Sequence, residues 1–123
     1  GTYGTSYTLG SMVEGETNGN FTFYSVTTAA DGVQNGGPDG FALSDSSGLI
    51  SFLSYEGSFT ATNGPASGQT STAISVSETN TTPENSSIHL VGSGSSSSSF
   101  TWAASIGQLL RHQLLEELLK VLM

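Results

Sequence analysis

Short runs of aromatic and β-branched residues alternate with small or polar residues along the first 106 positions. Alternation with a period of two predicts strands, and the Gly, Asn, Asp and Ser clusters between the runs predict turns. Turn signals about every 8–12 residues favour an antiparallel sandwich of roughly seven or eight short strands. After a ragged first strand within 1–13, the expected strands are 20–26, 41–45, 49–55, 58–62, 73–78, 88–91 and 100–102. A polar turn is expected at 14–20, and loops at 31–40, 63–68, 79–87 and 92–99.

The strongest local signal is a hairpin made by Phe41–Asp45 and Leu49–Tyr55. Ser46-Ser47-Gly48 lies between the two runs, and Gly48 is available for the left-handed position of a short hairpin loop. The second run carries apolar residues on both of its faces. This pattern predicts that the second run is a central strand.

The chain changes character at residue 107, where a leucine-rich segment begins. Its leucines recur at helical spacing and its polar residues share the other side, which predicts an amphipathic helix. A helix of roughly 16 residues is marginal alone in water, so it needs a surface to lie on. We therefore expect a β-sandwich at 1–106 and a helix at 107–123 that associates with a protein partner or with this chain itself. The apolar face of this helix comprises Leu110, Leu114, Leu115, Leu118, Leu119 and Leu122.

The distribution of charge restricts the classes of partner. Residues 1–107 contain no Lys or Arg, and their carboxylates account for the whole net charge of −8. Nucleic acids are bound largely through Lys and Arg on the phosphates, so direct nucleic-acid binding by this segment is not expected. No stretch approaches the roughly 20 apolar residues that span a bilayer. A surface rich in Ser, Thr and Gly and free of Lys is more typical of a secreted protein than of a cytosolic one.

The sequence offers few groups for catalysis. A serine or threonine nucleophile needs a base, and the two histidines are His89 and His112. His89 alternates with Ile88 and Leu90, so we expect it on the opposite face of its strand, at the surface or an edge. His112 lies on the polar side of the predicted helix. The acidic residues lie mostly in turns and loops without the pairing of a glycosidase site, so no enzyme activity is expected.

No metal or cofactor is expected, and calcium is the one metal for which the sequence offers candidate ligands. Asp31, Asn35 and Asp39 lie in a Gly-rich loop, and Ca²⁺ prefers oxygen ligands on irregular backbone. The spacing is not that of an EF-hand, so an ordinary cluster of Asp-Gly and Asn-Gly turns is favoured and a calcium site is the alternative. The chain has no cysteine, and its two histidines lie far apart in the sequence, which argues against zinc.

Glu56 follows Tyr55 at the end of a predicted strand and precedes Gly57. No basic residue or histidine lies near it in the sequence to mark it as an acid or base. We expect its carboxylate to accept backbone N–H bonds and to fix the turn.

Several runs of the chain resemble the lamin-tail-like domain of secreted bacterial proteins. The resemblance covers about residues 30–103, and Ser54-Tyr55-Glu56-Gly57 is its most specific part. Compared with the family, the chain begins inside the domain and ends in the leucine-rich segment rather than in a polar one. The matching runs are DGFALSD (39–45), ISFLSYEGSFTATNGPASGQTS (50–71), SVSE (75–78), SSIHLVGSG (86–94) and FTW (100–102).

The resemblance implies an immunoglobulin-like β-sandwich, export from the cell and a non-catalytic accessory or binding role. It also makes Tyr55, Glu56, Gly57 and Trp102 structural signature residues. The family often precedes an extracellular nuclease domain, so one alternative is a fragment of a secreted nuclease whose catalytic domain is absent. Another alternative is an adhesive or self-assembling subunit.

Overall fold

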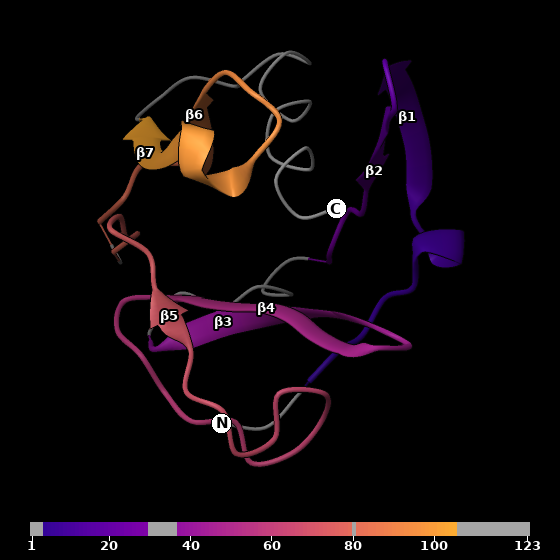
Figure 1. Ribbon diagram of the computed structural model, residues 1–123. Coiled ribbons are helices and arrows are strands. Elements are labelled where there is room, and N and C mark those ends of the chain that lie inside the picture. The colour runs from indigo at the N-terminus through magenta and orange to yellow at the C-terminus, as the bar shows by residue number, and fades with distance from the viewer. Residues whose placement is uncertain (1–3, 30–36, 80, 106–123) are drawn as a thin grey trace. The chain divides into compact units, whose positions relative to one another are not determined.

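The computed structural model describes residues 4–29, 37–79 and 81–105 (Figure 1). The chain divides into two compact units, and each is described by itself. The described residues of the first unit are 4–6, 37–79 and 81–82, and those of the second are 7–29 and 83–105.

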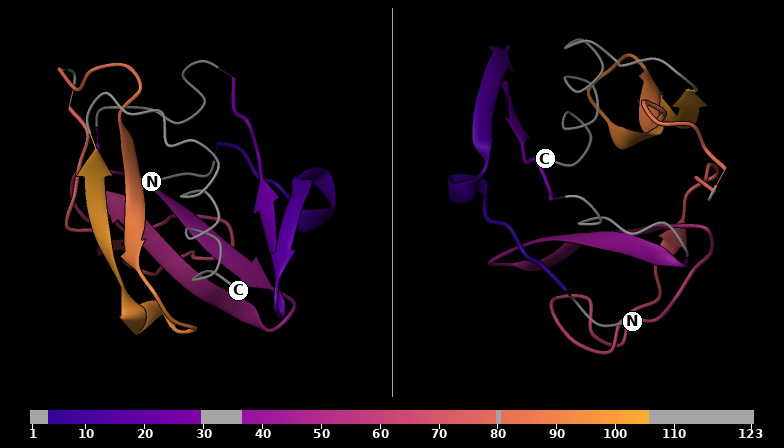
Figure 2. Two further views of the ribbon diagram at one scale, coloured as in Figure 1. Left: turned by 90° about the horizontal axis from the view of Figure 1, so that it is seen from above. Right: turned by 180° about the vertical axis from the view of Figure 1, so that it is seen from behind.

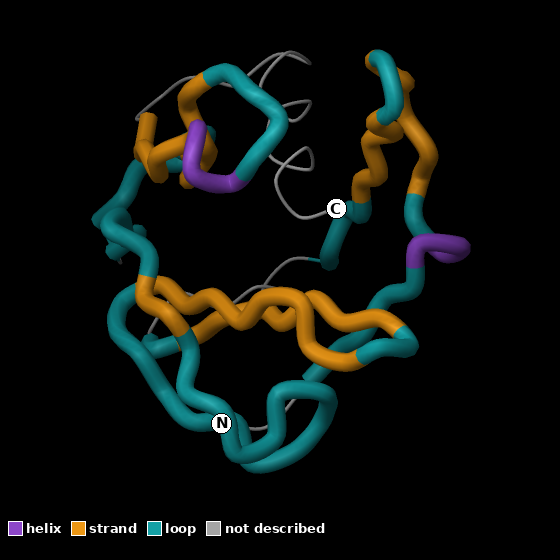
Figure 3. The backbone as a smooth tube through the Cα atoms, in the orientation of Figure 1, coloured by secondary structure: helices purple, strands orange, loops and turns teal. Residues whose placement is uncertain are grey.

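The described residues fold as strands with two short 3-10 turns and contain no α-helix (Figure 3). The prediction of an all-β fold is therefore confirmed for this part of the chain. The predicted helix at 107–123 lies outside the described residues. The elements are η1 (Leu9–Ser11), β1 (Val13–Asn18), β2 (Phe21–Ser25), β3 (Asp39–Asp45), β4 (Gly48–Tyr55), β5 (Thr72–Ala73), β6 (Ser87–Gly92), η2 (Ser97–Ser99) and β7 (Phe100–Ser105).

The first unit is built on a three-stranded sheet in the order β3-β4-β5, so β4 is central as predicted. β3 and β4 form the predicted hairpin, and Gly48 has a φ of 129°. Asp45 accepts hydrogen bonds from the hydroxyl of Ser47 at 2.6 Å and from its N–H at 2.7 Å. These bonds lower the pKa of the Asp45 carboxyl and hold the turn in place.

The antiparallel prediction is wrong for one pair of strands. β5 runs parallel to β4, with Leu53 opposite Thr72 and Ser54 opposite Ala73. A parallel pair needs a long connection between its strands. The chain between Tyr55 and Thr72 supplies this connection by leaving the sheet and returning to it.

This connection covers one face of the sheet and forms the core of the first unit. Phe52 packs with Ala61 and Ala66, and Ala42 and Phe59 pack against this cluster. The rings of Phe52 and Phe59 meet edge to face with their centroids 5.3 Å apart. This is a favourable geometry for two aromatic rings.

The predicted strands at 58–62 and 73–78 are wrong. Thr60 and Thr70 make only an isolated bridge, and the chain turns back between them. Backbone bonds from Ala61 N–H to Gln69 O at 3.0 Å and from Gly68 N–H to Ala61 O at 2.8 Å close this turn. The extended pairing therefore stops after a few residues. Of the predicted strand at 73–78, only Ala73 lies in a strand, β5 (Thr72–Ala73).

The second unit contains two hairpins, β1–β2 and β6–β7, whose strand directions can be followed in Figure 2. The predicted strands at 20–26, 88–91 and 100–102 correspond to β2, β6 and β7. Residues 14–20 are not the predicted turn, because β1 extends through Asn18 and the turn is confined to Gly19 and Asn20. The ragged strand expected within 1–13 is replaced in part by η1.

Within the described ranges, no helix is long and apolar enough to cross a membrane.

Candidate functional site

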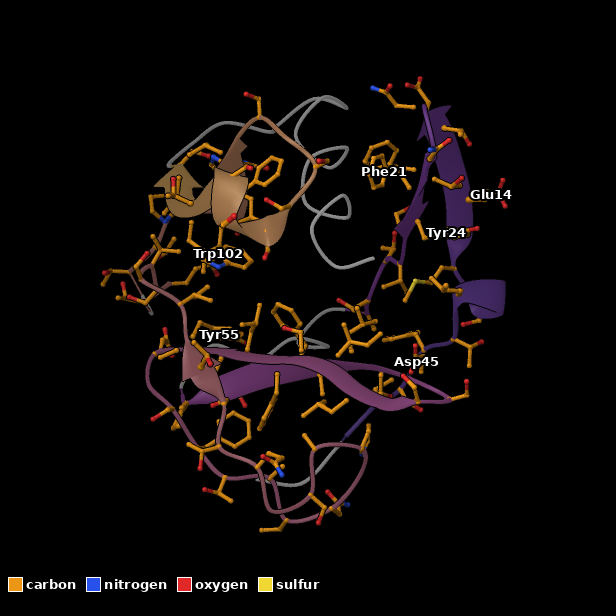
Figure 4. All side chains as sticks on the ribbon, viewed as in Figure 1. Glu14, Phe21, Tyr24, Asp45, Tyr55 and Trp102 are labelled. Carbon is orange, nitrogen blue, oxygen red and sulfur yellow. The ribbon has the colours of Figure 1, made fainter. Side chains whose placement is uncertain are left out.

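The most specific part of the family resemblance lies where β4 ends. Tyr55 is the last residue of β4 and stands opposite Asp39, the first residue of β3 (Figure 4). Glu56 and Gly57 follow immediately in the turn that leaves the sheet. The hairpin register therefore brings together Asp39, Tyr55 and Glu56, although Asp39 lies sixteen positions before Tyr55 in the sequence.

Negative charge collects around the Tyr55 phenol. Burial raises the pKa of Tyr55 above its ordinary value of 10.0, and the charges of Asp39, Glu56 and Glu78 raise it further. Burial and the neighbouring carboxylates each disfavour ionisation of the Tyr55 phenol. In the described part of the chain, Asp39 Oδ2 is buried and has no hydrogen-bond partner. We call Asp39, Glu56 and Glu78 the acidic cluster.

The raised pKa of Tyr55 predicts a loss of stability at alkaline pH. Above about pH 10 the unfolded chain releases the Tyr55 proton first, while the folded chain retains it. Ionisation therefore lowers the free energy of the unfolded state relative to the folded state, and the stability decreases as pH rises toward the folded pKa. We expect the tyrosinate absorbance of the native protein minus that of Tyr55→Phe to titrate with a midpoint above pH 10.

The variant Asp39→Asn serves as the control for this titration. It removes one of the charges that raise the Tyr55 pKa and keeps the shape of the side chain. The midpoint of the difference titration is expected to move down in this background. A midpoint at or below pH 10 in the native protein would contradict the environment described for Tyr55.

Glu56 holds an unusual backbone conformation. Its φ is 63°, in the left-handed region, and Gly57 follows with a φ of 122°. A left-handed conformation costs a residue with a side chain roughly 1–2 kcal/mol. Gly37 lies so close to Glu56 that a Cβ atom on Gly37 would stand 2.8 Å from Glu56 Cβ and 2.9 Å from Glu56 Oε2. The Glu56 side chain is thus packed against the segment that enters β3. The prediction that its carboxylate accepts backbone N–H bonds stays a prediction.

Of the three candidate calcium ligands, only Asp39 belongs to the described part of the chain. Asp31 and Asn35 lie outside it. Asp39 is the first residue of a strand rather than part of a loop, so its backbone is more regular than the prediction assumed. Among the described residues, no group of three or more His, Cys, Asp and Glu side chains is arranged to hold a metal ion.

His89 lies on β6, and its surroundings correct the prediction of a surface histidine. The β6–β7 register places it on the face opposite Ile88 and Leu90, as expected, but it is only 8% exposed. Ser87 Oγ lies 3.3 Å from His89 Nδ1 and 3.0 Å from the hydroxyl of Ser105. A chain of two hydroxyls and an imidazole results, in which either serine can rotate its proton to suit the tautomer.

Trp102, the fourth signature residue, lies on β7 in the second unit (Figure 4). It stands opposite Leu90 across the hairpin, so the two side chains share one face of the strand pair. Trp102 is half-buried and Leu90 is buried. This environment fits a packing role.

The sequence did not single out a pair of buried serines, Ser54 and Ser71. The hydroxyl of Ser71 donates a hydrogen bond of 2.7 Å to Ser54 Oγ, and Phe59 N–H donates one of 3.0 Å to Ser71 Oγ. The pair ties β4 to both ends of the connection that covers the core. The sequence carried one indication of this pair, because alternation along β4 places Ser54 on the same face as Phe52.

Neither a protein-family model nor a curated protein nor a solved structure matches this chain. The resemblance to a lamin-tail-like domain therefore stays a prediction. The candidate site consists of carboxylates, a phenol and a pair of hydroxyls. In this arrangement the hydroxyl pair of Ser54 and Ser71 ties the connection to β4 beside a small core.

Proposed function

We propose that this chain is a non-catalytic accessory or binding domain of a secreted bacterial protein. In this proposal residues 1–106 form an immunoglobulin-like β-sandwich, and residues 107–123 form a helix through which the domain associates. The all-β fold of the described residues and the absence of Lys and Arg from 1–107 support the proposal.

The geometry at Glu56 carries the proposal. Acid or base catalysis needs a carboxylate that reaches a substrate atom. The Glu56 side chain instead packs against Gly37, on a backbone held in the left-handed region. We therefore assign Glu56, in the most specific segment of the family resemblance, to a structural turn and not to catalysis. This assignment agrees with a non-catalytic accessory domain.

The role of Glu56 is tested by two substitutions at this one position. Glu56→Ala removes the carboxylate that lies against Gly37 but keeps Cβ and the left-handed strain, so we expect the free energy of unfolding to fall by about 1 kcal/mol. Glu56→Gly removes the whole side chain and the strain together, so it should be about 1 kcal/mol more stable than Glu56→Ala. Urea unfolding measures both differences. Glu84→Ala, at an exposed carboxylate in a turn, controls for the loss of one negative charge.

A plasmid-cleavage assay with Mg²⁺ on the same proteins separates this role from that of a nuclease fragment. The native chain and both variants are expected to leave the plasmid intact, beside a secreted nuclease as the positive control. Cleavage by the native chain that disappears in a stably folded Glu56→Ala protein would overturn the proposal.

The association role of residues 107–123 rests on the sequence, because this segment lies outside the described residues. We expect the sedimentation coefficient of the full chain to rise with concentration. Leu114→Glu should abolish the rise, because a charge on the apolar face of the predicted helix must be desolvated on association. Gln113→Glu adds the same charge on the polar side and should leave it unchanged. A full chain that stays monomeric at every concentration would count against self-association.

A further inference from the structure

We draw no further inference here: the strongest candidate, the acidic cluster of Asp39, Glu56 and Glu78 around Tyr55 at the end of the β3–β4 hairpin, has no second observation in the structure that points to a ligand.

Discussion

Gly40→Ala is expected to lower the free energy of unfolding by about 3 kcal/mol. Gly40 lies in β3 opposite Ser54 of β4. A Cβ atom on Gly40 would overlap the carbonyl oxygen of Leu53 and would stand 3.0 Å from Ser54 Cα. Both are backbone atoms of the central strand, so no side chain can rotate away to make room. The two strands must therefore separate locally.

The effect of Gly40→Ala is expected to extend into the core, because β3 and β4 carry core residues. Ala42 and Phe52 pack in the core of the first unit, two positions along from Gly40 and Ser54 respectively. A strand displaced at Gly40 shifts this pair against the connection that covers it. We expect a lower urea midpoint together with a change in the aromatic circular-dichroism signal, to which the Phe52–Phe59 contact contributes.

Gly15→Ala is the matched control for this prediction. Gly15 also lies within a strand, but a Cβ there would meet Phe23 O at 3.4 Å and Phe23 Cβ at 3.7 Å, which are ordinary contacts. Alanine restricts the unfolded chain at both positions, which favours folding by about 0.4–1 kcal/mol when the site has room. Gly15→Ala should be neutral or slightly stabilising. Equal midpoints for the two variants would show that β3 and β4 are not as close at Gly40 as the structure has them.

The strands that the sequence predicted well are those whose apolar residues alternate. In β2 and β3 aromatic or branched side chains alternate with other residues, β4 carries them on both faces, and Ser46 and Ser47 separate β3 from β4. In these segments burial and local conformation act in the same direction, so the pattern in the sequence survives into the fold.

The strand β1 was not predicted because most of its residues are polar and every one of them, Val13 included, is exposed. It is held by its partner β2, and the hydroxyls of Thr17 and Thr22 lie 3.1 Å apart across the pair. Pairing of this kind depends on the neighbouring strand and leaves no alternation in the sequence.

The segment 58–62 shows the opposite error, because its alternation suggested a strand where only Thr60 makes an isolated bridge. The buried Ala66 explains the difference. The chain turns back sharply between Thr60 and Thr70, which tucks this small side chain beneath Phe52. A contact between distant residues therefore ended a strand that local preference favoured.

The candidate site was predictable only in part. The sequence pointed to Tyr55-Glu56-Gly57 as a turn, and the positive φ values of Glu56 and Gly57 agree with that interpretation. The proximity of Asp39 and Glu78 to Tyr55 depends on strand register and on the return of the chain after the long connection. Burial of His89 likewise depends on tertiary packing, which a single-strand pattern does not contain.

The second large loss of stability is predicted for substitution of the buried serine pair, Ser54 and Ser71. We expect Ser71→Ala to lower the free energy of unfolding by about 2–3 kcal/mol. Ser71 is 5% exposed and Ser54 is 0% exposed, so water does not replace a lost partner. Without the Ser71 hydroxyl, Phe59 N–H loses its acceptor and Ser54 Oγ loses its donor. Two polar groups are then left unpaired beside the core, and each unpaired group costs free energy.

A double-mutant cycle measured by urea unfolding isolates the bond between the two serines. Ser54→Ala leaves only the Ser71 hydroxyl without its acceptor, so we expect a smaller loss of about 1–2 kcal/mol. In the double variant neither hydroxyl remains to be unsatisfied, so the loss should be clearly less than the sum of the single losses. Additive losses would mean that the two hydroxyls do not depend on each other.

Thr70→Val provides the exposed counterpart of Ser71→Ala. Thr60 Oγ1 and Thr70 Oγ1 lie 2.9 Å apart between the two arms of the connection, but this pair faces solvent. Valine keeps the shape of threonine and removes its hydroxyl, and water can then bond to the Thr60 hydroxyl. The expected change is within about 0.5 kcal/mol. If Ser71→Ala were as mild as Thr70→Val, burial of the serine pair could not be what secures the connection to β4. The closure of the first unit would then depend on the packing of Phe59, Ala61 and Ala66 against Phe52 and on backbone hydrogen bonds.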